Sequence, residues 1–150
     1  MKFFLLSLPF LFLLGCTSTR IKEKSYQANY LSEVYLKTLN FNGFELITVF
    51  IDNHWYYVRK DGKSMLAIMD DNGKADEFKE GLARTKVNGK IGFFNRSLDM
   101  VLEPIYDFAF SFHNGVAEIC MGCKEVDTEG EPMLDGGDWK KINRLGHVLE

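Results

Sequence analysis

The sequence predicts a mainly β protein in which antiparallel β-hairpin repeats form one domain, preceded by one N-terminal α-helix. Three observations predict this class. From Phe41 onward, apolar and polar residues alternate as they do in half-buried strands. Segments of the chain also align with one another in the same order, which indicates an internal repeat. Finally, turn signals are dense between the alternating segments: Asp61-Gly62, Asn72-Gly73, Asn88-Gly89 and Gly136-Gly137.

The N-terminus reads "MKFFLLSLPFLFLLGCTSTR", with one charge at Lys2 and an apolar run from Phe3 to Leu14. This run is shorter than the ~20 apolar residues that span a bilayer, and its layout is typical of an export signal. The ending Leu-Leu-Gly-Cys16 resembles the lipobox of bacterial lipoproteins. The resemblance implies a signal peptide over residues 1–15 and a lipid on Cys16 that anchors the chain in a membrane.

Thr17 stands where an Asp would resemble an inner-membrane retention signal, which favours the outer membrane. An ordinary cleaved signal, leaving a soluble secreted module, remains the alternative. Residues 16–24 are polar and lack periodicity, so they are expected to form a tether. Residues 25–40 place Leu31, Val34, Tyr35 and Leu39 at helical spacing. We expect a helix there, with Ser25 as N-cap, packing on a flank of the sheet or binding a partner.

Two alignments of the chain against itself define the repeat. "FKEGLARTK" (residues 78–86) matches "FHNGVAEIC" (residues 112–120), placing Gly81 on Gly115 and Ala83 on Ala117. A second register superposes three segments: "WYYVRKDG" (residues 55–62), "IGFFNRSL" (residues 91–98) and "WKKINRLG" (residues 139–146). Residues 41–150 are therefore expected to form one repeat domain, with units at about 44–77, 78–111 and 112–150.

The fullest unit, "FKEGLARTKVNGKIGFFNRSLDMVLEPIYDFAF", resembles the WG repeat family, whose theme is F-x-E-G-L-A-x-V…N-G-K-W-G-Y-I-(D/N)…G-x-(V/I)-I-x-P-x-Y-D. Asn88, Gly89 and Gly92 occupy matching positions, while Ile91 replaces the Trp. The resemblance implies a scaffold of stacked hairpins, since one short hairpin cannot bury its apolar face alone.

Stacking of this kind makes Trp55, Ile91 and Trp139 equivalent core positions. Gly81 and Gly115 become positions of close backbone approach or positive φ. On this interpretation Trp139→Ala costs about 3–5 kcal/mol, as for a large buried aromatic residue.

The motif "CMGC", Cys120 to Cys123, follows a predicted strand and precedes a charged loop. A disulfide suits an exported protein, and reduced structural thiols are the next interpretation. A thioredoxin-like role would need the pair to open a helix, and a zinc site would need a second ligand pair that the sequence does not offer.

Other candidate sites are weak, and no cofactor or metal is predicted. The carboxylates at residues 70–77 lack the spacing of a calcium loop and are expected to form a solvated turn. No nucleophile motif such as G-x-S-x-G is present.

The net charge of −3 does not support nucleic-acid binding, which needs a clustered basic face. We therefore expect a lipid-anchored envelope protein that is not an enzyme, binding an envelope protein or polymer. Open sheet edges would also allow self-association. The alternative is a small envelope enzyme or thiol-redox protein that uses Cys120 and Cys123.

Overall fold

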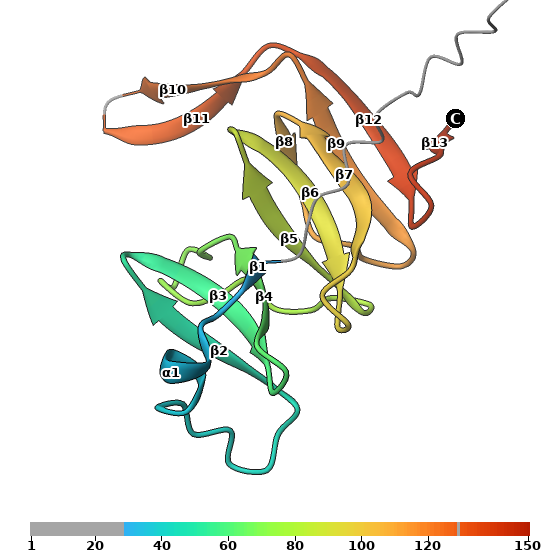
Figure 1. Ribbon diagram of the computed structural model, residues 1–150. Coiled ribbons are helices and arrows are strands. Elements are labelled where there is room, and N and C mark those ends of the chain that lie inside the picture. The colour runs from blue at the N-terminus through green and yellow to red at the C-terminus, as the bar shows by residue number, and fades with distance from the viewer. Residues whose placement is uncertain (1–28, 129) are drawn as a thin grey trace, which may run out of the picture.

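The computed structural model describes residues 29–128 and 130–150 (Figure 1). The predicted signal peptide, Cys16, the tether and the first residues of the predicted helix lie outside the described residues. Within them the structure is mainly β, as predicted, and every strand pairing is antiparallel. No helix among the described residues has the length and apolar character needed to cross a membrane.

Three sheets follow one another along the chain, and each is built on one hairpin and a third strand (Figure 1). The first unit holds β2 (Leu46–Ile51), β3 (His54–Arg59) and β4 (Lys63–Ala67), with β1 (Asn29–Tyr30) added at the edge beside β4. The second unit holds β5 (Leu82–Val87), β6 (Lys90–Asn95) and β7 (Met100–Tyr106). The third unit holds β8 (Phe108–Ala109), β9 (Val116–Met121), β12 (Asp138–Asn143) and β13 (Val148–Leu149).

The third unit differs from the others because its hairpin does not close with a two-residue turn. Instead, β9 continues into a separate hairpin of β10 (Lys124–Thr128) and β11 (Glu131–Asp135), which returns to β12. We call this hairpin the arm. Figure 1 shows it extending sideways from the junction of β9 and β12. The arm occupies the place where Asn88 and Gly89 connect β5 to β6 in the second unit.

The three units are equivalent residue by residue along their second strands. Trp55, Ile91 and Trp139 are each the second residue of β3, β6 and β12, respectively. Three residues further along, the equivalent side chains are all buried: Val58, Phe94 and Ile142. The turns that follow are also equivalent, since in each the N–H of one residue donates to the carbonyl three positions earlier: Gly62 to Arg59, Leu98 to Asn95 and Gly146 to Asn143. The predicted alignment of these segments is therefore confirmed.

Positive φ angles shape the turns at the predicted places. Gly81 and Gly115 have φ of +82° and +77°, and both sit in turns in which residues 79 and 82, or 113 and 116, exchange backbone hydrogen bonds. Asn88 and Gly89 have φ of +51° and +79°, the pair of left-handed conformations that a two-residue hairpin turn requires.

Gly92 serves a different purpose, because its φ is not positive and the problem there is space. A Cβ at Gly92 would lie 2.7 Å from the carbonyl oxygen of Leu102 and 2.7 Å from the nitrogen of Pro104. The register between β6 and β7 shifts at this point, so β7 bulges against β6. The other two units have Tyr56 and Lys140 at the equivalent position. Tyr56 pairs in regular register with β4, and no such bulge crosses it.

Two hydrophobic clusters join the units, one at each interface. Between the first and second units lie Tyr57, Ala67, Ala75, Ala83, Phe94 and Leu98. Between the second and third units lie Leu82, Ile91, Phe93, Leu102, Tyr106, Ala109, Phe112, Ala117, Ile119 and Ile142. Both faces of the second unit are therefore buried, which explains why β6 carries the apolar run Ile91 to Phe94 where a one-sided strand would alternate.

Two equivalent carbonyls, one in β5 and one in β9, each accept a backbone hydrogen bond from the chain segment that precedes the strand. The N–H of Ile68 donates to the carbonyl of Arg84 at 3.1 Å, and the N–H of Phe110 donates to the carbonyl of Glu118 at 2.9 Å. Residue 84 in β5 and residue 118 in β9 correspond in the predicted alignment. The preceding segment is therefore held at the same place in the second and third units, and the second unit presents one face to the first unit and the other to the third.

The predicted helix over residues 25–40 is wrong in extent. The helix α1 covers only Glu33–Leu36, and its N-cap is Ser32, whose side chain accepts from the N–H of Tyr35. Asn29 and Tyr30 pair with β4 instead of continuing the helix. Sheet pairing at the start competes with helix formation, and a helix of one turn has no stability of its own.

The predicted burial of Trp139 is also wrong, although its position in the repeat is right. Its side chain is 42 % exposed, whereas Ile91 at the equivalent position is 3 % exposed. Trp55 is partly buried, and its Nε1 donates to the carbonyl of Gly73 at 2.9 Å. Ile91 is covered because a third unit follows the second. No fourth unit among the described residues covers Trp139, which borders a cavity beside the arm.

Candidate functional site

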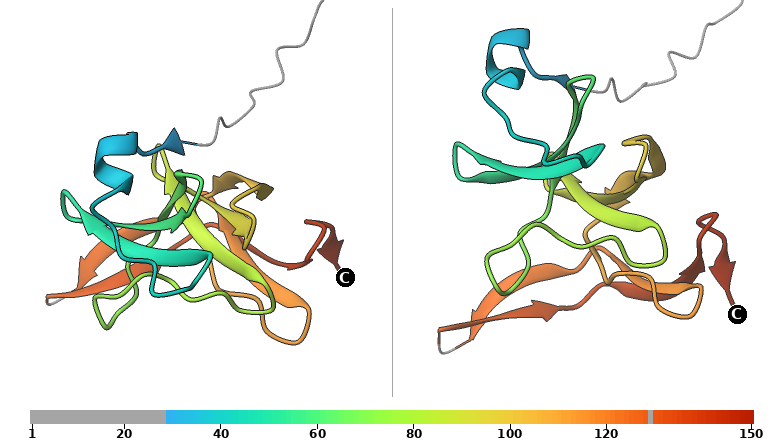
Figure 2. Two further views of the ribbon diagram at one scale, coloured as in Figure 1. Left: turned by 60° about the horizontal axis from the view of Figure 1, so that its bottom comes forward. Right: turned by 90° about the horizontal axis from the view of Figure 1, so that it is seen from below.

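The candidate site is the outer face of the third unit, which we call the open face. It is defined by Phe110, Val116, Glu118, Trp139 and Lys141. Val116, Glu118, Trp139 and Lys141 occupy the positions that Leu82, Arg84, Ile91 and Phe93 hold in the second unit. There, the three apolar side chains pack against the third unit. The open face is therefore the surface that the repeat geometry uses for stacking, left without a neighbour among the described residues (Figure 2).

The open face carries exposed aromatic side chains in mutual contact. Phe110 is 48 % exposed, and its ring centroid lies 6.2 Å from that of Trp139. Phe108 lies beside both, with centroids 5.0 Å from Phe110 and 6.1 Å from Trp139. Strand β8 produces this grouping, because Phe108 and Phe110 alternate with the buried Ala109 and so share one side of the sheet.

Two charges lie next to the aromatic group. Glu118 and Lys141 face each other across the β9–β12 pair, with the Lys141 Nζ 3.6 Å from a Glu118 carboxylate oxygen. Both side chains are more than half exposed. An exposed pair of this kind stabilises the fold by at most about 1 kcal/mol. Lys141 replaces the buried Phe93 of the second unit, so the open face is more polar than an internal stacking surface but retains its aromatic part.

The surface beside these residues is hollowed. One hollow of about 380 Å³ is lined by Phe110, Ser111, His113, Val116, Glu118 and Lys141. A smaller one of about 200 Å³ is lined by Glu118, Trp139, Lys140 and Lys141. Exposed aromatic residues surrounded by charged ones are typical of binding surfaces, whose energetic centres are rich in Trp and Arg. The open face therefore has the composition of a macromolecular interface.

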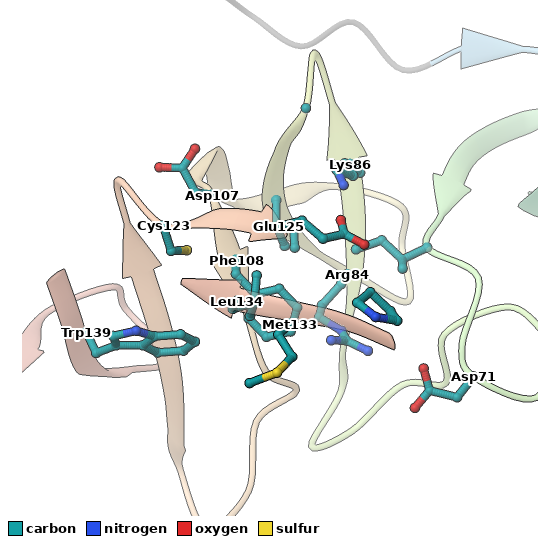
Figure 3. Close-up of a pocket in the computed structure, with 14 residues that line it drawn as sticks. Asp71, Arg84, Lys86, Asp107, Phe108, Cys123, Glu125, Met133, Leu134 and Trp139 are labelled. Atoms are coloured by element: carbon teal, nitrogen blue, oxygen red, sulfur yellow. The ribbon is translucent and has the colours of Figure 1, made fainter. Parts of the chain in front are cut away.

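A larger cavity of about 640 Å³ lies between the arm and the repeat units (Figure 3). Figure 3 shows the Trp139 ring extending toward Phe108 and Met133, while Arg84 and Asp71 lie on the opposite wall. Arg84 already has partners, because it contacts the Asp76 carboxylate at 2.5 Å and donates from Nη1 to the carbonyl of Ala109 at 2.9 Å. The charged residues that line the cavity are of both signs: Arg84 and Lys86 are basic, and Asp71, Asp107 and Glu125 are acidic.

The pair of Asp76 and Arg84 was missed in the sequence, where residues 70–77 were expected to form a solvated turn. Asp70 fits that expectation, since its carboxylate is exposed and accepts from the N–H groups of Asn72 and Lys74. Asp76 does not, because it is 4 % exposed. No sequence signal distinguishes Asp70 from Asp76, because the burial of Asp76 depends on its contacts with the backbone N–H and the guanidinium of Arg84 in β5.

The base of the arm is held by the predicted disulfide. The structure joins Cys120 to Cys123, with their Cα atoms 6.0 Å apart. Gly137 packs directly against this link, since a Cβ there would lie 2.5 Å from the Cys120 Sγ and 2.5 Å from the Cys123 nitrogen. Cys120 is completely buried and Cys123 is 7 % exposed. Because thiol exchange needs access to the sulfur, this geometry favours a structural link over a redox centre.

Asp107 links the base of the arm to strand β6 of the second unit. Its carboxylate forms an ion pair with Lys90 and accepts from the N–H of Gly122 at 2.6 Å. The hydrogen bond from Lys90, followed by that from Gly122, lowers the pKa of Asp107 below its usual value. The base of the arm is therefore fixed by a covalent link on one side and by an ionised carboxylate on the other.

In the part of the chain that the structure describes, no group of three or more His, Cys, Asp or Glu side chains could hold a metal ion.

The comparisons with known proteins fit the repeat architecture. The family model described as WG containing repeat matches residues 71–90 and 91–124. Residues 71–124 are thus similar to WG repeats. The second matched segment runs from β6 through β9 to the first residue of β10, so it includes the place where β8 pairs with β9. No curated protein and no solved structure matches the chain.

Proposed function

We propose that the chain is a non-catalytic binding module of the bacterial cell envelope and that the open face is its binding surface. One observation carries the proposal. The face that is buried by stacking in the second unit is exposed in the third, with Trp139 at 42 % and Phe110 at 48 % exposure. Aromatic residues left exposed in contact with one another are typical of a surface that a partner covers.

The leader supports placing this module at the envelope. We propose that residues 1–15 act as a signal peptide, that Cys16 carries lipid, and that the anchor lies in the outer membrane. Acyl chains on Cys16 would concentrate the module at a surface, where each buried methylene contributes about 0.8 kcal/mol. The partner would then be an envelope protein or polymer within reach of the tether.

A photo-crosslinking amino acid placed at position 139 of the full chain tests the binding surface. Cells carrying this variant should give crosslinks on irradiation, and so should cells carrying the group at position 110. The matched control places the group at Val101, which is 40 % exposed on the edge strand β7 of the second unit. The proposal fails if positions 139 and 110 give no more crosslinks than position 101.

Radiolabelled fatty acid tests the anchor separately. The unaltered chain should incorporate label, and Cys16→Ser should abolish incorporation. If the wild-type chain incorporates no label and is released from the membrane in soluble form, the anchor proposal fails, and residues 1–15 are an ordinary cleaved signal.

A further inference from the structure

We propose that the open face binds a second copy of the same chain, face to face across a two-fold axis. This inference rests on the proposed function, because it names the partner of the same surface. It differs from association through sheet edges, since the contact is made by side chains of the sheet face and adds no strand to the sheet.

The first argument is that the opposite end of the stack is closed. In the first unit Val58 is fully buried, although no repeat unit precedes it among the described residues. The N-terminal segment covers that end: β1 pairs with β4, the N–H of Leu31 donates to the carbonyl of Gly62, and the Leu36 side chain lies against Gly62. Figure 2 shows α1 at one end of the stack and the third unit at the other.

The covered first unit disfavours head-to-tail stacking of copies. If both ends were open, the third unit of one copy could pack on the first unit of the next, and repetition would give a filament. Because α1 and β1 occupy the first end, the open face of one copy can reach an equivalent repeat surface only on the open face of another. That arrangement is a closed dimer.

The second argument is that the open face is complementary to itself. Trp139 lines a small hollow that shares Glu118 and Lys141 with the larger hollow lined by Phe110, His113 and Val116. In a two-fold contact, a projecting side chain of each copy enters the hollow of the other, because every contact between two different residues occurs twice. The aromatic rings of both copies would then be removed from water together.

Charge supports the same arrangement. Glu118 and Lys141 lie side by side at the rim of the hollow. A face that holds one acid and one base is complementary to its own copy, since the two-fold axis can place each Glu118 opposite the Lys141 of the other chain. With few large apolar side chains on the face, we expect a dissociation constant on the order of micromolar.

Charge reversal tests the proposal in the full chain, extracted in mild detergent. Glu118→Lys makes both charges of the rim positive, and Lys141→Glu makes both negative. Each variant alone should dimerise at least tenfold more weakly than wild type in sedimentation equilibrium. When the two variants carry different tags and are mixed, they should co-purify as a heterodimer, because the positive face then meets the negative one.

The matched control uses another exposed ion pair, Glu45 and Lys60 of the first unit. Glu45→Lys and Lys60→Glu should leave the dissociation constant of the dimer unchanged. If chains were associated only because they share a detergent micelle, all variants would associate equally well. Circular dichroism melts of every variant establish that it is folded. A wild-type chain that stays monomeric up to about 100 times the expected dissociation constant overturns the proposal, and so does a mixture of Glu118→Lys and Lys141→Glu that fails to associate.

The crosslinks from position 139 separate this proposal from the proposed function. A crosslinked product of twice the chain mass supports the dimer. A product with a different protein or a polymer, together with a monomeric chain, overturns the dimer and leaves the binding module standing. Absence of any product from both position 139 and position 110 defeats both proposals.

Discussion

The second and third units have equivalent backbones but opposite surroundings, and their comparison shows what determines burial in this protein. Ile91 and Trp139 are each the second residue of a central strand, yet Ile91 is 3 % and Trp139 is 42 % exposed. Two residues further on, the buried Phe93 corresponds to the exposed Lys141. The position in the repeat determines where a side chain points, while the next unit determines whether it meets protein or water.

The largest expected effect comes from truncating the two equivalent side chains. Ile91→Ala should lower the free energy of unfolding by about 2–5 kcal/mol, since it removes buried methyl groups from the cluster between the second and third units. Trp139→Ala, although it removes more atoms, should lower it by less, about 1 kcal/mol, because 42 % of its side chain is already exposed to solvent. Urea unfolding of both variants measures the difference, and equal losses would show that the two positions have the same surroundings.

The glycine that follows provides the next comparison. Gly92→Ala should lower the free energy of unfolding by about 1–3 kcal/mol, because the new methyl group must displace backbone atoms of Leu102 and Pro104. At the equivalent position of the third unit, Lys140→Ala should change it by no more than about 0.5 kcal/mol. Thermal unfolding of the pair tests this contrast. If Gly92→Ala leaves the free energy of unfolding unchanged, β7 can move away from β6 without a measurable loss of stability.

The disulfide is a feature of the third unit that the second lacks. Converting Cys120 and Cys123 together to Ala should lower the free energy of unfolding by about 2 kcal/mol, the value for a short closed loop. Reductant should lower the wild-type stability by a similar amount and leave the double variant unaffected. Urea unfolding with and without reductant measures both effects. If reductant does not change the unfolding of the wild-type chain, the assignment of a disulfide between Cys120 and Cys123 is contradicted.

The smallest expected effect concerns the joint between these units at Asp107. Its pKa is lower in the folded chain than in the unfolded chain, where the usual value is about 3.9. The stabilisation is therefore fully present above that value and is lost as the pH falls through the folded pKa. Unfolding measured between pH 6 and pH 2 should show a weaker acid dependence for Asp107→Asn than for wild type. An unchanged dependence would show that the ion pair with Lys90 does not contribute.

Local features of the fold could be predicted from the sequence because their causes are local. Asn88 and Gly89 adopt the positive φ angles that their residue types tolerate, and the second-strand residues align as the repeat predicted. Leu98 is instructive, since it breaks the Gly pattern of the turn yet still adopts φ of +58°. Its side chain is 1 % exposed, and burial among the residues joining the first two units offsets the strain.

The features that could not be predicted depend on contacts between distant residues. Nothing in residues 29–32 alone indicates that Asn29 and Tyr30 pair with β4, so the helical spacing around them was extended too far. The partnership of Asp76 with Arg84 depends on how the second unit packs on the first. For the candidate site, the alternation of Phe108, Ala109 and Phe110 was a usable strand signal that placed both rings on one side. The exposure of Trp139 had no such signal, because it depends on the neighbour that the third unit lacks within the described residues.

The closed base of the arm has a consequence for how this repeat tolerates changes in length. Gly122 and Gly137 approach each other so closely that a Cβ on Gly122 would lie 4.0 Å from the Cα of Gly137. The backbone therefore leaves the third unit at Gly122 and returns to it at Gly137, next to the point where it left. The Asn88-Gly89 turn brings the ends of β5 and β6 together in the same way. The segment between Cys123 and Gly136 is thus an insertion into a hairpin whose two strands, β9 and β12, already meet at its base. We therefore expect an affinity tag or a foreign loop inserted there to leave the register of β9 and β12 intact.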